Sequence, residues 1–111
     1  MVELHDALRD WGTDAFARSL KREIEGLGTG VLPLDRATAH GGHVDDADLV
    51  ATVIDAADAV TFIRARVGVF FAEIIAGCSC GDDPFAQPAY CEIEVRIDKS
   101  TAVAVFTLIP A

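Results

Sequence analysis

The sequence predicts an α+β domain in which N-terminal helices pack on a three- or four-stranded antiparallel meander sheet. The first 25 residues carry apolar residues at helical spacing, whereas residues 60–109 are rich in β-branched and aromatic residues that alternate with polar ones. The chain has 111 residues, of which 51% are hydrophobic and 24% charged. This size and composition are typical of one globular domain, so we expect residues 1–111 to fold as a single unit.

Two helices are expected near the N-terminus instead of one. Apolar residues before and after residue 15 form two helical stripes whose directions differ by roughly 150°. Because one straight helix cannot bury both stripes, we expect a short helix ending near Asp10 and a second one from Thr13 to Glu25. Gly12 lies at the join, Thr13 is suited to cap the second helix, and Gly26 is suited to end it.

The middle of the chain combines a turn, a loop and an ambiguous segment. Pro33 ends any helix before it, and residues 34–39 are expected to make one further turn. Residues 39–48, which include two adjacent glycines and three aspartates, are expected to form a polar loop. Residues 49–58 fit a helix by their apolar spacing and a strand by their β-branched content.

Strands are predicted for residues 60–78, 90–98 and 102–109. In the first strand, alternation places an apolar set on the core side (Ile63, Ala65, Val67, Val69 and Phe71). Arg64 and Arg66 lie on the other side. The predicted strand is longer than usual, so we expect a bend or bulge near Gly68. In the second strand, the core side carries Cys91, Ile93, Val95 and Ile97.

The last two strands are expected to form a hairpin. With Lys99 and Ser100 as its loop residues, Ala104 would lie opposite Val95 and share its core face. In this register Val103 and Val105 lie on the outer face, where they would be exposed.

The charge of the chain restricts its partners. The chain has nine basic and 18 acidic residues, which gives a net charge of −9. The surplus of acidic residues is concentrated in residues 35–58. Such a field repels phosphate backbones and anionic lipid surfaces, so we expect no nucleic acid and no membrane as a partner. The N-terminus does not resemble a secretory signal, and three cysteines do not make a disulfide framework. We therefore expect a cytoplasmic protein with reduced thiols.

The residues that most suggest chemistry are Cys78, Cys80, Asp82, Asp83 and Cys91. The first four lie between two predicted strands, whose pairing would return Cys91 towards them. Three thiolates with an aspartate suit zinc or another transition metal, and a thiol-redox loop is a second hypothesis. Against both, the spacing is not a standard zinc pattern, and Cys91 lies on the apolar side of its strand. The interpretation that ranks above both hypotheses is that the three thiols are buried or unreactive.

Other polar groups carry weaker signals. His40 and His43 could hold a metal with Asp45 and Asp46, although histidines in a solvated loop are common. The two arginines of the first strand suit an anion or the solvated side of a sheet. The chain contains no G-x-S-x-G, H-E-x-x-H or Walker motif, so no catalytic residue is predicted. An enzyme with an unrecognised site stays open as a third hypothesis.

The segment RVGVFFAEIIAGCSCGDDP, followed by YCEIEVRIDKST, resembles a family of short bacterial proteins. That family shares an apolar strand ending in AGCSC, a DDP turn, a YCE strand and an ID-K-x-T turn. The resemblance covers Arg66 to Leu108 and implies a strand at residues 49–55, which is why we favour a strand there. It implies no catalytic residue, because the family has no established activity. The chain departs from the pattern at Ala102, where relatives tend to place glycine. This departure leaves the turn type of the last hairpin open, but not the hairpin itself.

Two functional hypotheses of different classes follow. In the first, a small acidic cytoplasmic protein binds a metal or switches thiol state through the loop with Cys78, Cys80 and Cys91. In the second, the chain is a non-catalytic protein-interaction module or a homodimer, and its cysteines are structural. The outward-facing Val103 and Val105 motivate the second hypothesis. Burial of Cys91 without a sulfur neighbour would favour it as well.

Overall fold

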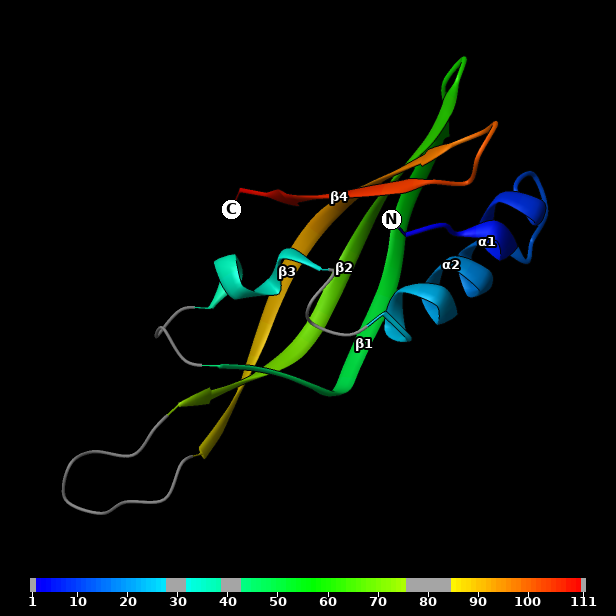
Figure 1. The fold of residues 1–111 in the computed structure, drawn as a ribbon. Helices are drawn as coiled ribbons and strands as arrows, with labels where there is room; N and C mark the ends of the chain where they lie inside the picture. Colours follow the sequence, from blue (N-terminus) through cyan, green and yellow to red (C-terminus); the bar gives the residue numbers. More distant parts are fainter. Residues whose placement is uncertain (1, 28–31, 39–42, 76–84, 111) are drawn as a thin grey trace, which may run out of the picture.

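The computed structural model describes residues 2–27, 32–38, 43–75 and 85–110 (Figure 1). Its elements are the helices α1 (His5–Arg9) and α2 (Phe16–Glu25), the 3-10 helix η1 (Pro33–Ala37), and the strands β1 (His43–Asp58), β2 (Phe62–Ile75), β3 (Phe85–Asp98) and β4 (Ala104–Ile109). The four strands form one antiparallel sheet in the order β1-β2-β3-β4. This meander confirms the predicted α+β class with an antiparallel sheet.

The sheet has a covered face and an open face. Burial alternates along β2 and β3, and their odd-numbered residues from 63 to 71 and from 91 to 97 are buried. These side chains share one core cluster with Leu20 and Ile24 of α2 and Leu34 of η1, so they lie on the covered face. Arg64 and Arg66 are exposed on the open face. The face assignments predicted for both strands are therefore confirmed.

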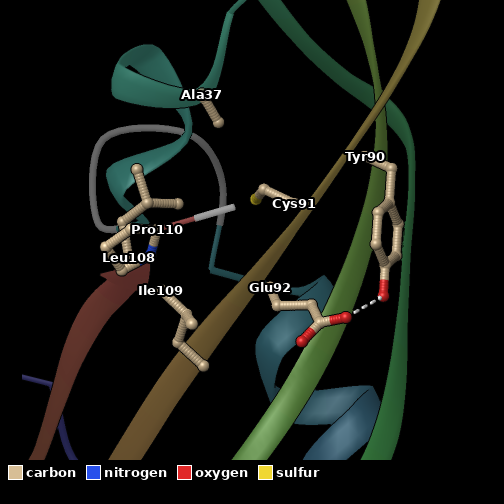
Figure 2. Close-up of a pocket in the computed structure, with 7 residues that line it drawn as sticks. All are labelled: Ala37, Tyr90, Cys91, Glu92, Leu108, Ile109 and Pro110. Atoms are coloured by element: carbon tan, nitrogen blue, oxygen red, sulfur yellow. Dashed lines mark hydrogen bonds between the residues drawn. The ribbon is translucent and has the colours of Figure 1, made fainter.

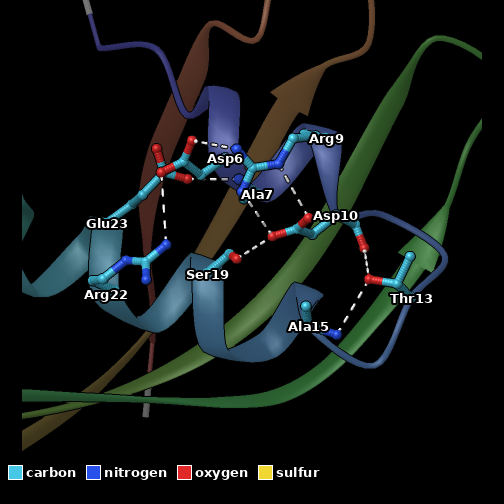
Figure 3. A network of polar contacts seen from close by, with 9 residues as sticks. All are labelled: Asp6, Ala7, Arg9, Asp10, Thr13, Ala15, Ser19, Arg22 and Glu23. Carbon is cyan, nitrogen blue, oxygen red and sulfur yellow. Dashed lines mark hydrogen bonds and ion pairs between the residues drawn. The ribbon is translucent and has the colours of Figure 1, made fainter.

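Polar contacts hold α1 against α2 (Figure 3). Glu23 accepts a hydrogen bond of 2.7 Å from the backbone N–H of Ala7, which lies in the first turn of α1 and has no partner within that helix. Arg9 pairs with Asp6 at 3.3 Å and with Asp10 at 3.2 Å, and Asp10 also accepts a hydrogen bond from Ser19 of α2. The contacts of Glu23 with Ala7 and of Ser19 with Asp10 fix how the two helices cross.

The two predicted helices are present, but α2 begins at Phe16 and not at Thr13. The Thr13 hydroxyl donates to the Asp10 carbonyl at 2.7 Å and accepts from the Ala15 N–H at 3.2 Å, so it stabilises the turn between the helices. Gly12 has a φ of +84°, which glycine adopts without strain. Its place at the join is thus a backbone requirement.

Strand β1 begins at His43, inside the segment predicted to be a polar loop, while residues 39–42 lie outside the described residues. His43 and Val44 pair with Ile74 and Glu73 of β2. Pairing with a neighbouring strand satisfies backbone groups whatever the side chains are, and here it outweighs the low β-propensity of aspartate. Residues 49–58, which fit both a helix and a strand by sequence and for which we favoured a strand, lie in β1.

The irregularity predicted near Gly68 of β2 lies in β1 instead. Val53 pairs with Val67 and Asp55 with Arg66, so Ile54 is an extra residue in β1. A second register shift lies between residues 45 and 50, where five steps along β1 match two along β2. The pairing of β2 with β3 is continuous from residue 62 to residue 75. An edge strand has one neighbour and can bulge freely, whereas a bulge in β2 would disturb pairing on both sides.

The β3–β4 hairpin is shifted by two residues from the predicted register. Val95 lies opposite Phe106, not Ala104, and residues 99–102 form the loop. The predicted core faces still hold, because side chains alternate with a period of two. Ala102 has a φ of +65° in a region that favours glycine. Residues 2–4 pair with residues 102–104 and extend the sheet beyond the start of β4.

Candidate functional site

Most of the predicted metal ligands lie outside the described residues, namely Cys78, Cys80, Asp82 and Asp83. The same holds for His40. His43 is exposed at the start of β1, and Asp45 is half-buried there. Within the ranges that the structure describes, no group of three or more His, Cys, Asp or Glu residues is placed to hold a metal ion.

Of the cysteines and aspartates in the main predicted ligand set, Cys91 is the one within the described residues. It lies on the covered face of β3 with 8% of its surface exposed, and its thiol is free. Burial, together with the neighbouring charge of Glu92, raises the pKa of the Cys91 thiol to about 11. The thiolate, which is the form that binds metals and attacks disulfides, is therefore scarce at neutral pH.

The strand register sets the distance between Cys91 and the segment with the other cysteines. Cys91 pairs with Val69, six residue pairs from the described end of the β2–β3 ladder at Ile75 and Phe85. At about 3.3 Å per residue, six residues span about 20 Å. For the predicted ligand set to form, Cys78 and Cys80 would have to come back along the sheet by this distance to reach Cys91.

A cavity of about 470 Å³ lies beside Cys91, where β4 ends (Figure 2). Its lining comes from η1, β3 and the end of the chain: Ala37, Tyr90, Cys91, Glu92, Leu108, Ile109 and Pro110. The size is that of cavities which bind small molecules or a buried side chain. The Glu92 carboxylate accepts a hydrogen bond of 3.0 Å from the Tyr90 hydroxyl and lies 3.4 Å from Arg66 Nε. At neutral pH the Cys91 thiol is protonated, and the Glu92 carboxylate is engaged by Tyr90 and Arg66.

The open face carries a row of apolar side chains that the sequence did not reveal. Val50, Phe70 and Tyr90 are neighbours across β1, β2 and β3, with exposed fractions of 43%, 50% and 47%. The Phe70 and Tyr90 ring centroids are 4.7 Å apart. We call these three residues the exposed row. The strand register is the signal that would have identified it, since the three residues are far apart in sequence.

Charged side chains lie on the open face between the exposed row and the β3–β4 hairpin. Arg66 lies 3.8 Å from the Asp55 carboxylate in addition to its contact with Glu92. Arg96 lies 3.3 Å from the Glu94 carboxylate, and its guanidinium stacks over the Phe62 ring at 4.3 Å. Arg66 is thus engaged by carboxylates, as on a solvated sheet face, and is not held ready for an anion.

No protein-family model, curated protein or solved structure matches the chain. No helix in the described ranges is long and apolar enough to cross a membrane.

Proposed function

We propose that the chain is a non-catalytic protein-interaction module that binds a protein partner through the exposed row. The observation that carries the proposal is the adjacency of Val50, Phe70 and Tyr90, each nearly half exposed, on three neighbouring strands. Single exposed apolar residues are normal on a protein surface, whereas a contiguous group is typical of an interaction site.

The surroundings of the exposed row support this proposal. Arg66 and Glu92 form an ion pair beside the row on the same face, and charged residues that border an apolar centre are usual in a transient interface. Tyrosine suits such a centre, because its ring buries apolar area while its hydroxyl keeps a polar partner. Here that partner is Glu92.

A pair of matched variants tests the proposal. Phe70→Ser removes the middle side chain of the exposed row, and Val105→Ser removes an exposed side chain elsewhere on the open face. Val105 pairs with Arg96, which pairs with Arg64, six residues from Phe70 along β2. That spacing corresponds to about 20 Å.

Wild type and both variants are immobilised, and the proteins captured from a lysate of the producing cells are compared by quantitative mass spectrometry. We expect a protein retained by wild type and by Val105→Ser to be lost with Phe70→Ser. Identical capture by all three, with circular dichroism showing that each is folded, would contradict the proposal.

A metal-binding or thiol-redox loop at Cys78, Cys80 and Cys91 is the competing proposal, and the raised pKa of the Cys91 thiol argues against the redox form of it. Native mass spectrometry of protein purified under reducing conditions without chelator separates the two. The interaction module predicts a bare mass with three free thiols. One metal per chain that is lost in Cys80→Ser would favour the metal site and displace our proposal.

A further inference from the structure

The Tyr90 ring packs on the sheet and leaves much of its surface to solvent. It crosses β2 at Gly68, where a Cβ atom would lie 2.6 Å from the Tyr90 hydroxyl oxygen and 2.9 Å from a ring carbon. Tyr90 is nevertheless 47% exposed, and its neighbour Phe70 is 50% exposed. In the described part of the chain, no guanidinium or ammonium stacks on either ring.

Another aromatic residue of the open face shows what such a ring can bind. The Arg96 guanidinium lies 4.3 Å from the centroid of the Phe62 ring and 3.3 Å from the Glu94 carboxylate. A cation is attracted to an aromatic face, and the same guanidinium can pair with a carboxylate. Tyr90 and Glu92 offer these two partners again, with the Glu92 carboxylate 3.0 Å from the Tyr90 hydroxyl (Figure 2). A stacked cation is what this second arrangement lacks.

The charge beside the exposed row is negative. Among the described residues that pair with residues 68–72 of β2, the charged ones are Asp45 and Glu92, both acidic. Arg66 lies 3.4 Å from Glu92 and 3.8 Å from Asp55, so two carboxylates share its charge. The whole chain has a net charge of −9, which attracts basic partners and repels acidic ones before contact. Charge complementarity therefore favours a basic partner.

A shallow apolar hollow of about 240 Å³ continues the exposed row. It is lined by Phe70, Phe71, Ala72, Ala86 and Pro88. The hollow is smaller than the roughly 300 Å³ at which small-molecule sites begin, so its size suits one apolar side chain. Ala72 lies four residues along β2 from Gly68, over which the Tyr90 ring lies, and this spacing is about 13 Å.

We propose that the partner presents a basic, extended segment to the exposed row. An arginine of the segment stacks on Tyr90 and pairs with Glu92, and an apolar side chain about four residues away fills the hollow. Arginine suits this place better than lysine, because its planar guanidinium stacks on a ring and bonds a carboxylate at the same time. The inference rests on the proposed function and names the chemistry of the partner.

Selection from a random dodecapeptide library displayed on phage tests this chemistry. The library is first depleted on immobilised Phe70→Ser and then selected on wild type. We expect the selected peptides to carry an arginine and an apolar residue about four positions apart. Val105→Ser, which changes an exposed residue elsewhere on the open face, is the control and should bind the same peptides. Circular dichroism establishes that each variant is folded.

A double-mutant cycle tests the stacking. The most enriched peptide and a version with its arginine replaced by glutamine are labelled with fluorescein, and binding is measured by fluorescence polarisation. Tyr90→Phe keeps the ring and should bind the arginine peptide within about twofold of wild type. Tyr90→Leu keeps an apolar side chain without an aromatic face. It should raise the dissociation constant at least about fivefold for the arginine peptide and much less for the glutamine peptide.

A pair of charge variants tests the carboxylate. Glu92→Gln should weaken binding of the arginine peptide severalfold, because the guanidinium loses its charged partner. Asp14→Asn removes the same charge at an exposed position between α1 and α2 and should have a much smaller effect. Equal effects of the two variants would mean that only the net charge attracts the peptide, and would overturn the stacked arrangement.

Selected peptides that need Phe70 but lack a basic residue would overturn this inference and leave the proposed function standing. An equal effect of Tyr90→Leu on both peptides would do the same. A library without any peptide that distinguishes wild type from Phe70→Ser would also overturn the inference, while the lysate capture with Phe70→Ser judges the proposed function independently.

Discussion

The residue that best shows how surroundings decide chemistry is Cys91. Three thiols in a chain this short suggest reactivity, yet this one is buried among apolar neighbours on the covered face. A thiolate there would lose its hydration without gaining a cationic partner, so the proton is held to a higher pH. The side chain then behaves as a small apolar residue.

We predict that Cys91 reacts slowly with a thiol reagent in the folded protein. A rise in the thiol pKa from about 9 to about 11 lowers the thiolate fraction at neutral pH roughly 100-fold. The measurement is the rate with a disulfide reagent in the Cys78→Ser, Cys80→Ser background, in which only Cys91 reacts. The rate should rise about tenfold per pH unit through pH 10 and approach that of a free cysteine in denaturant. A native rate at neutral pH equal to the denatured rate would show that the thiol is accessible and ionised.

At the scale of elements, Gly68 and Tyr90 explain how an aromatic residue comes to lie flat on the open face. A Cβ atom at Gly68 would lie 2.6 Å from the Tyr90 hydroxyl oxygen and 2.9 Å from a ring carbon. The ring therefore occupies the space that a side chain at position 68 would need. Glycine inside a strand is unfavourable by itself, and the packed ring compensates for it.

We predict that Gly68→Ala has opposite effects in two backgrounds. In wild type it forces the Tyr90 ring away and should lower the free energy of unfolding by about 1 kcal/mol. In a Tyr90→Ser background the space is free, and alanine should raise the free energy of unfolding by about 0.5–1 kcal/mol. Urea titrations of wild type, the two single variants and the double variant measure the coupling. Equal effects of Gly68→Ala in both backgrounds would mean that the ring does not pack over position 68.

The β3–β4 turn is stabilised by one carboxylate. Asp98 accepts hydrogen bonds from the Ser100 hydroxyl at 2.6 Å, the Ser100 N–H at 2.8 Å and the Thr101 N–H at 3.2 Å. The bonds from Ser100, followed by that from Thr101, hold the pKa of Asp98 below its usual value. The folded state thus favours the ionised carboxylate more than the unfolded state does.

A pH dependence follows from this difference. The carboxylate contributes stability above the unfolded pKa of about 3.9, and this contribution is lost as the pH falls through the folded pKa of Asp98. Asp98→Asn removes the charge while keeping one acceptor oxygen. We expect the variant to be less stable than wild type at neutral pH and the difference to shrink as the pH falls below the unfolded pKa of about 3.9. Thermal unfolding at several pH values measures it, and a constant difference would contradict this account.

At the scale of the whole molecule, the helices and the sheet depend on one another for their core. Leu20 and Ile24 of α2 lie in the same cluster as Val67 and Ile93 of the sheet, and all four are fully buried. A sheet with one apolar face is unstable in water until something covers that face. Helices as short as α1 and α2 are marginal alone, so packing supplies most of their stability.

We predict that Leu20→Ala destabilises the helices and the sheet together, by about 2–5 kcal/mol, because the cavity left behind borders both. Unfolding followed by far-UV circular dichroism and by the fluorescence of Trp11 should give coincident transitions in wild type and in the variant. Separate transitions would show that the N-terminal helices unfold independently of the sheet. Lys21→Ala, at the next position of α2 but half-exposed, is the control and should cost much less.

The covered face of β2 and β3 was predictable from the sequence, and so were the turn at Gly12 and the end of α2 before Gly26. Alternation with a period of two and the conformational needs of a turn are local properties, so the residues from Ile63 to Phe71 and from Cys91 to Ile97 reveal them without knowledge of their neighbours. The turn after β3 shows what a local pattern does not predict. The faces of Ala104 and Phe106 followed from parity, whereas their pairing partners did not.

The sequence by itself thus determined an α+β domain with an antiparallel sheet and the side chains that its core would take. Only the tertiary structure decided that β1 starts at His43 and carries the register shifts. It also decided that Val50, Phe70 and Tyr90 form a row. Finally, it decided that β3 extends beyond its pairing with β4, beside a cavity. These features depend on which strand lies beside which and how far each extends. Packing between side chains distant in sequence, together with the geometry of the turns, settles that choice, and no local pattern reports it.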